Sequence, residues 1–167
     1  RERREAEERA EVERICGRIV SDCRQDQHPY LAAKGFPDEL GLVHDHPQSL
    51  MPEGRFGEML AGAMPETSDP VLIVPGRIGK QVTTVQFITS TGEKKNILRG
   101  KMGGASHRVA SGRQVVVCEG ISTALSVRAA LRLLGVSATV LSAFSASNVA
   151  AVARGIPGAM IAADHDK

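Results

Sequence analysis

The sequence predicts an α/β protein whose last third is a parallel β-sheet flanked by helices. The run Val115 to Cys118 is continuously apolar, which is typical of a strand buried on both faces of such a sheet. Aromatic residues make up only 3% of the 167 residues, so the core must be built from aliphatic side chains, which suit this architecture. After Gln114 the order strand, helix, strand, helix, strand predicts one parallel sheet through right-handed crossovers.

The N-terminal segment, residues 1–36, is predicted to be helical. Between Val12 and Cys23 apolar residues recur every three or four positions, which places them on one face of a helix. The residues before Val12 are mostly Glu and Arg, so this part is expected to be a solvated, frayed extension held by ion pairs. The stretch His28 to Phe36 is predicted to contain a second, short helix that ends at Gly35.

Residues 37–113 are predicted to form a small basic module of irregular segments and antiparallel strands. Proline, glycine and acidic residues dominate from Pro37 to Pro70, with one short helix near Phe56 to Leu60. A glycine-rich basic connection, Gly100 to Ser111, ends the module. Before this connection, runs of β-branched residues predict three strands: Val71–Pro75, Gln81–Thr89 and Asn96–Leu98.

Residues 114–167 are predicted to form the βαβαβ unit. Its later strands are expected at Ala138–Leu141 and Ala159–Ala163, and its second helix at Ser147–Ala153. Ser122 or Thr123 is in position to cap the first helix, which Gly135 ends. The predicted apolar stripe of that helix includes Leu125, Ala129, Leu133 and Leu134.

Charge is segregated along the chain, although the formal net charge is only +2. From Gly35 to Pro70 seven acids oppose one arginine, giving −6, and from Val71 to Val117 eight bases oppose one acid, giving +7. A basic block of this kind favours a polyanionic partner, the alternative being solvated turn side chains. The candidates for binding the phosphates of nucleic acid or nucleotide are Arg77, Lys94, Lys95, Arg99 and Lys101.

Cysteine usage and hydropathy exclude several classes of protein. Three cysteines without a CxxC pair provide neither a disulfide framework nor a zinc ribbon. No apolar run approaches the ~20 residues that cross a bilayer, and the charged N-terminus is unlike a signal peptide. We therefore expect a soluble, cytoplasmic protein without a membrane partner.

Other candidate site residues are weak. Ser142 and Ser145 follow a predicted strand but lack the GxSxG elbow of a serine hydrolase. The segment His44 to His46 offers metal ligands, but it lies beside Pro47 in an acidic loop, where exposed side chains are expected.

Acidic residues end two strands of the predicted parallel sheet. Glu119 follows the first strand, and Asp164 follows the third. Because ligands bind at the carboxyl ends of parallel strands, these acids are expected to meet at one edge. Asp166 would lie on the same face as Asp164, about 6.5 Å away between Cα atoms. Such hard oxygen ligands favour Mg²⁺ or Mn²⁺; the alternative is that each acid caps a helix or faces solvent.

The segments VVVCEGISTALSV and MIAADHDK resemble the Toprim domain, with its strand-end Glu-Gly and its later Asp-x-Asp. Upstream, HPYLAAKGF and VTTVQFITSTGEKKNILRGKMGG are similar to phage- and plasmid-type DNA primases of the bacterial primase superfamily. The resemblance runs from about Gln27 to the C-terminus. It implies a nucleotidyltransferase that makes RNA primers on single-stranded DNA from nucleoside triphosphates, with Glu119, Asp164 and Asp166 as catalytic, metal-binding residues.

The resemblance also implies features that this sequence lacks. Such primases carry a zinc-binding module and often a replicative helicase, and their sheet continues after Asp-x-Asp, so the chain is expected to be a catalytic-core fragment. Glu119 is left open as a metal ligand or a general base. Two alternatives use the same fold: a non-catalytic DNA-binding or docking module, and a Toprim nuclease. A topoisomerase is disfavoured because the one tyrosine, Tyr30, lies in a predicted structural helix.

Overall fold

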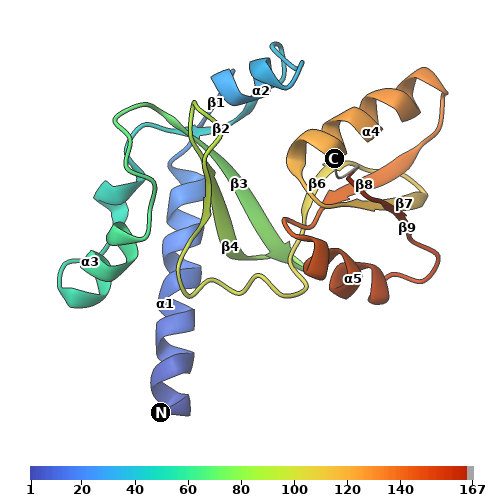
Figure 1. Cartoon of the computed structure of the whole chain (residues 1–167). Helices are drawn as coiled ribbons and strands as arrows, with labels where there is room; N and C mark the ends of the chain where they lie inside the picture. Colours follow the sequence, from blue (N-terminus) through green and yellow to red (C-terminus); the bar gives the residue numbers. More distant parts are fainter. Residues whose placement is uncertain (165–167) are drawn as a thin grey trace. The chain divides into compact units, whose positions relative to one another are not determined.

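A computed structural model of the chain describes residues 1–164, which form two compact units (Figure 1). Unit 1 comprises residues 1–75 and 80–101, and unit 2 comprises residues 76–79 and the chain from Met102 onward. These boundaries differ from those of the three predicted segments, because the N-terminal helix shares unit 1 with the antiparallel strands. Asp166, one of the three predicted metal ligands, lies outside the described residues.

Unit 1 is a five-stranded sheet with the strand order β1-β2-β3-β4-β5. The pairs β1/β2, β2/β3 and β4/β5 are antiparallel, as the sequence predicts for this module. A turn at Gly79 and Lys80 separates β3 from β4, and β3 ends in unit 2. The elements are α1 (Glu2–Ser21), β1 (Arg24–Asp26), α2 (Pro29–Ala33), β2 (Gly41–His44), the 3-10 helix η1 (Pro47–Leu50), α3 (Arg55–Gly62), β3 (Val71–Ile78), β4 (Gln81–Ile88) and β5 (Lys94–Asn96).

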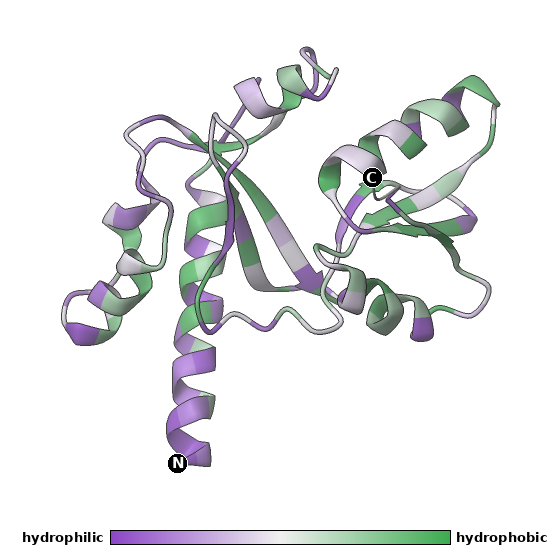
Figure 2. Cartoon of the chain, viewed as in Figure 1, coloured by the Kyte–Doolittle hydropathy of each residue, from purple (hydrophilic) through white to green (hydrophobic). Residues whose placement is uncertain are grey.

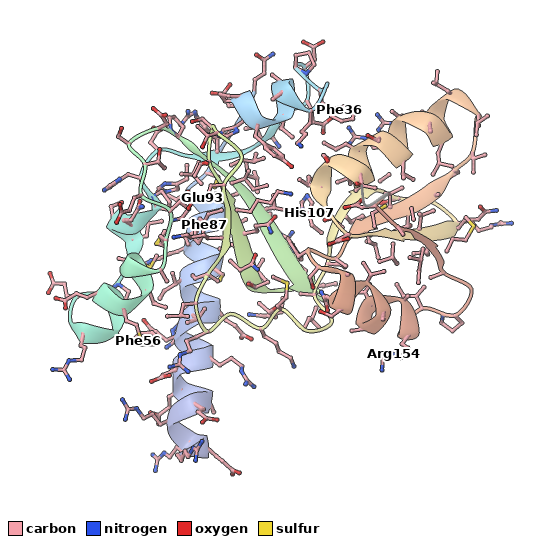
Figure 3. All side chains as sticks on the ribbon, in the orientation of Figure 1. Phe36, Phe56, Phe87, Glu93, His107 and Arg154 are labelled. Atoms are coloured by element: carbon pink, nitrogen blue, oxygen red, sulfur yellow. The ribbon has the colours of Figure 1, made fainter. Side chains whose placement is uncertain are left out.

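The apolar face of α1 packs on this sheet. Val12, Ile15 and Ile19 are buried against β4, whose Phe87 is labelled in Figure 3. The first turns of the helix are hydrophilic (Figure 2) and carry ion pairs four residues apart, including Arg3–Glu7 and Arg4–Glu8. The ion pairs confirm the prediction, whereas the expected fraying is wrong, because the helix is continuous from Glu2.

Unit 2 is a four-stranded sheet with the order β6-β8-β7-β9, in which β7 is parallel to both β8 and β9. The prediction of a parallel βαβαβ unit is therefore confirmed. The sequence did not predict β6, which lies in the expected glycine-rich connection and pairs antiparallel with β8. The elements are β6 (His107–Ala110), β7 (Gln114–Cys118), α4 (Ile121–Leu133), β8 (Ala138–Ser142), α5 (Ala146–Arg154) and β9 (Met160–Ala162).

Helices α4 and α5 cover opposite faces of this sheet (Figure 1). Val116 and Cys118 of β7 pack in the core on the α4 side, and Val117 packs with Val149 and Val152 of α5. The burial of both faces explains why β7 is apolar at successive positions. Among the described residues, no helix combines the length and apolar composition that a bilayer crossing requires.

The details of α4 correct two predictions. Gly120 occupies the N-cap position without a side-chain hydrogen bond, so neither Ser122 nor Thr123 caps the helix. Leu133 and Leu134 are 90% and 75% exposed, which places the end of the predicted apolar stripe in solvent. Leu125 of the predicted stripe is buried as expected, together with Ile121 and Ala124 nearer the N-terminus of the helix. Gly135, at φ 69°, follows the helix end as predicted.

Candidate functional site

The carboxyl ends of β7, β8 and β9 lie at one edge of the unit 2 sheet. In the register, Cys118 pairs with Ser142 on one side and Ala162 on the other. Glu119 follows Cys118 directly, and Asp164 lies two residues beyond Ala162. Neighbouring strands are about 4.8 Å apart, so both acids lie at this edge, at the ends of two adjacent strands. We call Glu119 and Asp164 the carboxylate edge.

Asp164 is oriented by α4 and influences β7. The Thr123 hydroxyl, in the first turn of α4, donates a hydrogen bond to Oδ1 of Asp164. Burial raises the pKa of the Cys118 thiol to about 11, and the negative charge of Asp164 adds to this rise. The Asp164 carboxylate is therefore electrostatically coupled to the end of β7. The thiol beside it remains protonated at neutral pH.

The backbone of Glu119 is fixed by the loop after β8. Its carbonyl accepts hydrogen bonds from the Phe144 N–H, at 2.7 Å, and from the Ser142 hydroxyl, at 3.3 Å. Phe144 has φ of 76°, in the left-handed region that costs a non-glycine residue about 1–2 kcal/mol. Strain of this kind is typical of functional sites. The Glu119 side chain is partly buried.

Asn148 of α5 holds the loop in place. Its side-chain amide donates to the carbonyls of Ala105 and Ala143, both at 2.8 Å, and its Oδ1 accepts from the Gly104 N–H at 2.7 Å. The residue is 5% exposed. Three hydrogen bonds from this buried side chain thus join α5 to the loop at the carboxylate edge and to the segment before β6.

Charge in unit 2 is sharply divided. Glu119 and Asp164 are the two acidic residues in its described part. The six basic residues there are Arg77, Arg108, Arg113, Arg128, Arg132 and Arg154, which gives a net charge of +4. Negative charge is therefore confined to the carboxylate edge.

The carboxylate edge supplies donors of the type that Mg²⁺ and Mn²⁺ prefer, namely carboxylate oxygens beside a protonated thiol. Within residues 1–164, no three His, Cys, Asp or Glu side chains gather closely enough to hold a metal ion. The register places two of the three predicted ligands at the carboxyl ends of neighbouring strands. Asp166 lies outside the described residues. The donor chemistry of Glu119 and Asp164 fits the predicted ion.

The predicted phosphate-binding cations have different surroundings. Lys94 pairs with Ile88 at one end of β4, whereas the Lys101 N–H donates to Thr83 near the other end. Five residues of strand separate these points, or about 17 Å. Lys101 and Arg99 line a small cavity of about 240 Å³ with two acids of α1, Glu5 and Glu8. Arg77 belongs to unit 2.

Lys94 belongs to a compact cationic group with Tyr30. The Nζ atoms of Lys34 and Lys94 lie 5.6 Å and 5.4 Å from the centroid of the Tyr30 ring. Tyr30 is 4% exposed in α2, as expected for a structural helix, and both lysines are exposed. Cation–π attraction holds the two ammonium groups over one rigid ring. Lys95, the next residue, pairs with Glu93 at 3.7 Å.

Other candidates prove structural. His44 is buried and its Nε2 lies 2.7 Å from Asp22 Oδ2, so its predicted exposure is wrong, although Asp45 and His46 are exposed. Ser142 is buried, and Ser145 caps α5 by accepting from Asn148 N–H. These contacts leave neither serine in the setting of an activated nucleophile.

Sequence reasoning missed four residues around these sites: Lys34, His107, Phe144 and Asn148. His107, labelled in Figure 3, pairs with Ser142 of β8. Ser142 pairs in turn with Cys118, the residue before Glu119. No periodicity marks these residues. The HPYLAAKGF segment offered a signal for Lys34, because Lys34 follows Tyr30 by four residues, the spacing that places two side chains on one face of a helix.

In comparisons with known proteins, no protein-family model, no curated protein and no solved structure matches the chain.

Proposed function

We propose that the chain carries the catalytic core of a metal-dependent nucleotidyltransferase of the DNA primase type, built on a Toprim-like unit 2. The observation that carries the proposal is the convergence of Glu119 and Asp164 at the carboxyl edge of a parallel sheet. The resemblance of the Glu-Gly and Asp-x-Asp segments to the Toprim domain supports the same assignment. The substrates are nucleoside triphosphates and a single-stranded DNA template, and a replicative helicase is the expected partner.

Glu119 and Asp164 would hold Mg²⁺ or Mn²⁺, together with Asp166. A bound ion neutralises the triphosphate and makes a 3′-hydroxyl more acidic. In the reaction, the 3′ oxygen forms a bond to the α-phosphorus of the incoming nucleotide, the bond to pyrophosphate breaks, and the hydroxyl proton leaves. Thr123 orients Asp164 through its hydrogen bond, and the Ser142 and Phe144 donors fix the backbone of Glu119, which serves as ligand or proton acceptor.

Binding of the template is assigned to exposed cations. Lys34 and Lys94 are the favoured pair in unit 1, because both lie over the Tyr30 ring and both are exposed. Such a pair suits the phosphates of a flexible strand. Arg99 and Lys101 are weaker candidates since Glu5 and Glu8 share their cavity. Lys95 is weakened in the same way by Glu93.

The test is primer synthesis on a single-stranded DNA template with labelled nucleoside triphosphates and Mn²⁺. Asp164→Asn and Glu119→Gln are expected to reduce product formation by roughly 100-fold or more, because each removes charge from the site that faces the reacting phosphates. Asp38→Asn is the matched control, since it removes an exposed carboxylate of unit 1 and is expected to leave the rate unchanged. Full activity of Asp164→Asn would contradict the proposal.

The same reactions separate the two alternative functions. Shortening of a labelled template that depends on Asp164 would indicate a nuclease, in which water replaces the 3′-hydroxyl as nucleophile. Template binding with neither product nor a Mn²⁺ effect would indicate a docking module. Either result would replace the primase assignment.

A further inference from the structure

A cavity of about 570 Å³ lies within unit 2, on the side of the sheet that α5 covers. Its apolar wall includes Leu141 of β8, Val152 of α5, and Ile156, which follows that helix. Its polar side includes two arginines, Arg77 and Arg108. Among the described residues that line it, none is acidic.

The backbone sets the two arginines side by side. Arg77 and Ser106 exchange both of their backbone hydrogen bonds, at 2.9 Å and 3.0 Å. Arg108 follows Ser106 by two residues on β6, so the pleat turns its side chain to the same face as Ser106 and Arg77. The diagonal separation of Arg77 and Arg108 is about 7–8 Å between Cα atoms. One phosphate group can contact guanidinium groups from both.

Neither arginine is neutralised by the described part of the chain. Both side chains are exposed, and no described acid forms an ion pair with either. Guanidinium groups bind phosphate oxygens through parallel hydrogen bonds. The cavity is therefore electropositive, whereas the carboxylate edge is electronegative. Anionic ligands are therefore favoured in the cavity and disfavoured at the carboxylate edge.

We propose that this cavity binds one nucleotide, with its phosphate between Arg77 and Arg108 and its sugar and base against Leu141, Val152 and Ile156. The volume lies in the range of small-molecule sites. Arg108 pairs with Leu141, one register row before the row of His107 and Ser142 that adjoins the carboxylate edge. The nucleotide is either a free nucleoside triphosphate or one unit of a DNA strand. This inference rests on the proposed function, whose substrate or template it places in the cavity, and it requires no metal.

The experiment measures binding of a fluorescent ATP derivative and of a labelled ten-nucleotide oligothymidylate to the whole chain. EDTA is present, so that a metal at the carboxylate edge does not contribute. Arg77→Ala and Arg108→Ala are each expected to weaken binding of one probe at least tenfold. Because both side chains are exposed, their removal leaves the core intact.

Arg154→Ala is the matched control. Arg154, labelled in Figure 3, is an exposed arginine in the last turn of α5 that does not line the cavity. Its loss removes the same charge and is expected to change affinity by less than twofold. Ala151→Leu tests the apolar wall, because it fills the cavity while keeping both arginines; it is expected to weaken binding at least fivefold.

The two probes distinguish the sources of the nucleotide. Arginine-dependent binding of the ATP derivative assigns the cavity to a free nucleotide, and arginine-dependent binding of the oligonucleotide alone assigns it to a strand. Equal losses in Arg108→Ala and Arg154→Ala, or no loss in either, would overturn the inference. Asp164→Asn should bind both probes normally in EDTA, so failure of primer synthesis and failure of this cavity are separate results.

Discussion

The two sheets of this protein place their candidate site residues in opposite ways. In unit 2 the parallel strands β7 and β9 bring Glu119 and Asp164 to one edge, although more than forty positions of sequence separate them. In unit 1 the antiparallel strands disperse residues that are neighbours in sequence. Lys94 lies at one end of β4, and Lys101 lies near the other.

The difference follows from connectivity. Parallel strands must be linked by crossovers, so all their carboxyl ends and the following loops gather on one side. Antiparallel strands reverse direction at every turn, so consecutive turns alternate between the two ends of the sheet. Convergence of distant residues is therefore a property of the parallel sheet. In unit 1, charged residues that are close in sequence can lie at opposite ends of the sheet.

The convergence should be most sensitive to Asn148, which anchors the loop after β8. Asn148→Ala leaves the Gly104 N–H and the Ala105 and Ala143 carbonyls without their side-chain partner. We expect a loss of about 2–4 kcal/mol in the free energy of unfolding, measured by chemical denaturation. Ser147→Ala, an exposed neighbour, should cost less than about 0.5 kcal/mol. Equal stability of the two variants would show that the loop needs no anchor.

Orientation of Asp164 by α4 offers a sharper test of the parallel edge. Thr123→Val keeps the shape of the side chain but removes the hydroxyl that donates to Asp164. We expect Mn²⁺ affinity to fall roughly tenfold, because partners that orient a ligand commonly contribute 10–100-fold. Thr123→Ser should retain most of the affinity, and Ser126→Ala, on the exposed face of α4, should retain all of it. Electron paramagnetic resonance of free Mn²⁺ measures each value.

In unit 1 the comparison predicts unequal contributions from equal charges. The double variant Lys34→Ala/Lys94→Ala should lower the log-log salt slope of single-stranded DNA binding by about 1.4, or 0.7 for each phosphate that no longer meets a lysine. Arg99→Ala/Lys101→Ala removes the same charge beside Glu5 and Glu8 and should lower it by less than half as much. Fluorescence anisotropy at several salt concentrations gives both slopes. Identical slopes would mean that position in the sheet does not matter.

The smallest expected effect is on Cys118. Asp164→Asn removes one cause of the raised pKa, so the thiol should titrate below its present pKa of about 11. The change should be small because burial is the larger cause. The raised pKa means that this thiol contributes stability below about pH 9, which is lost as the pH rises through about 11. The variant should lose less stability over that interval. Thiolate absorbance follows the titration of Cys118 in a background in which the other two cysteines, Cys16 and Cys23, are replaced by alanine. An unchanged pKa would place Asp164 away from β7.

Most of unit 2 was predictable from the sequence because its signals are local and strong. The apolar run of β7, the glycine after α4 and the acids after β7 and β9 each reflect a direct physical demand. The parallel register then follows from chain connectivity. The role of Thr123 was not predictable, since a threonine in the first turn of a helix suggests a cap, and its contact with Asp164 spans 41 residues.

The failures share a physical cause, which is dependence on partners distant in sequence. Strands β1 and β2 have three and four residues and are stabilised by pairing with each other and with β3, so they carry little pattern of their own. His44 is buried because Asp22, the residue that ends α1, meets it. Strand β6 likewise gains its structure by pairing with β8.

If Asp164 and Glu119 form a cation site, as proposed, thermal unfolding of the protein should respond to Mn²⁺ through these two carboxylates. Carboxylates that share an edge repel one another, so Asp164→Asn should melt at the same temperature as the unchanged protein in EDTA, or slightly higher. Its amide oxygen can still accept from Thr123. Mn²⁺ should raise the melting temperature of the unchanged protein by several degrees and leave the variant unaffected. A variant that melts several degrees lower in EDTA and shows the full Mn²⁺ shift would contradict the claim.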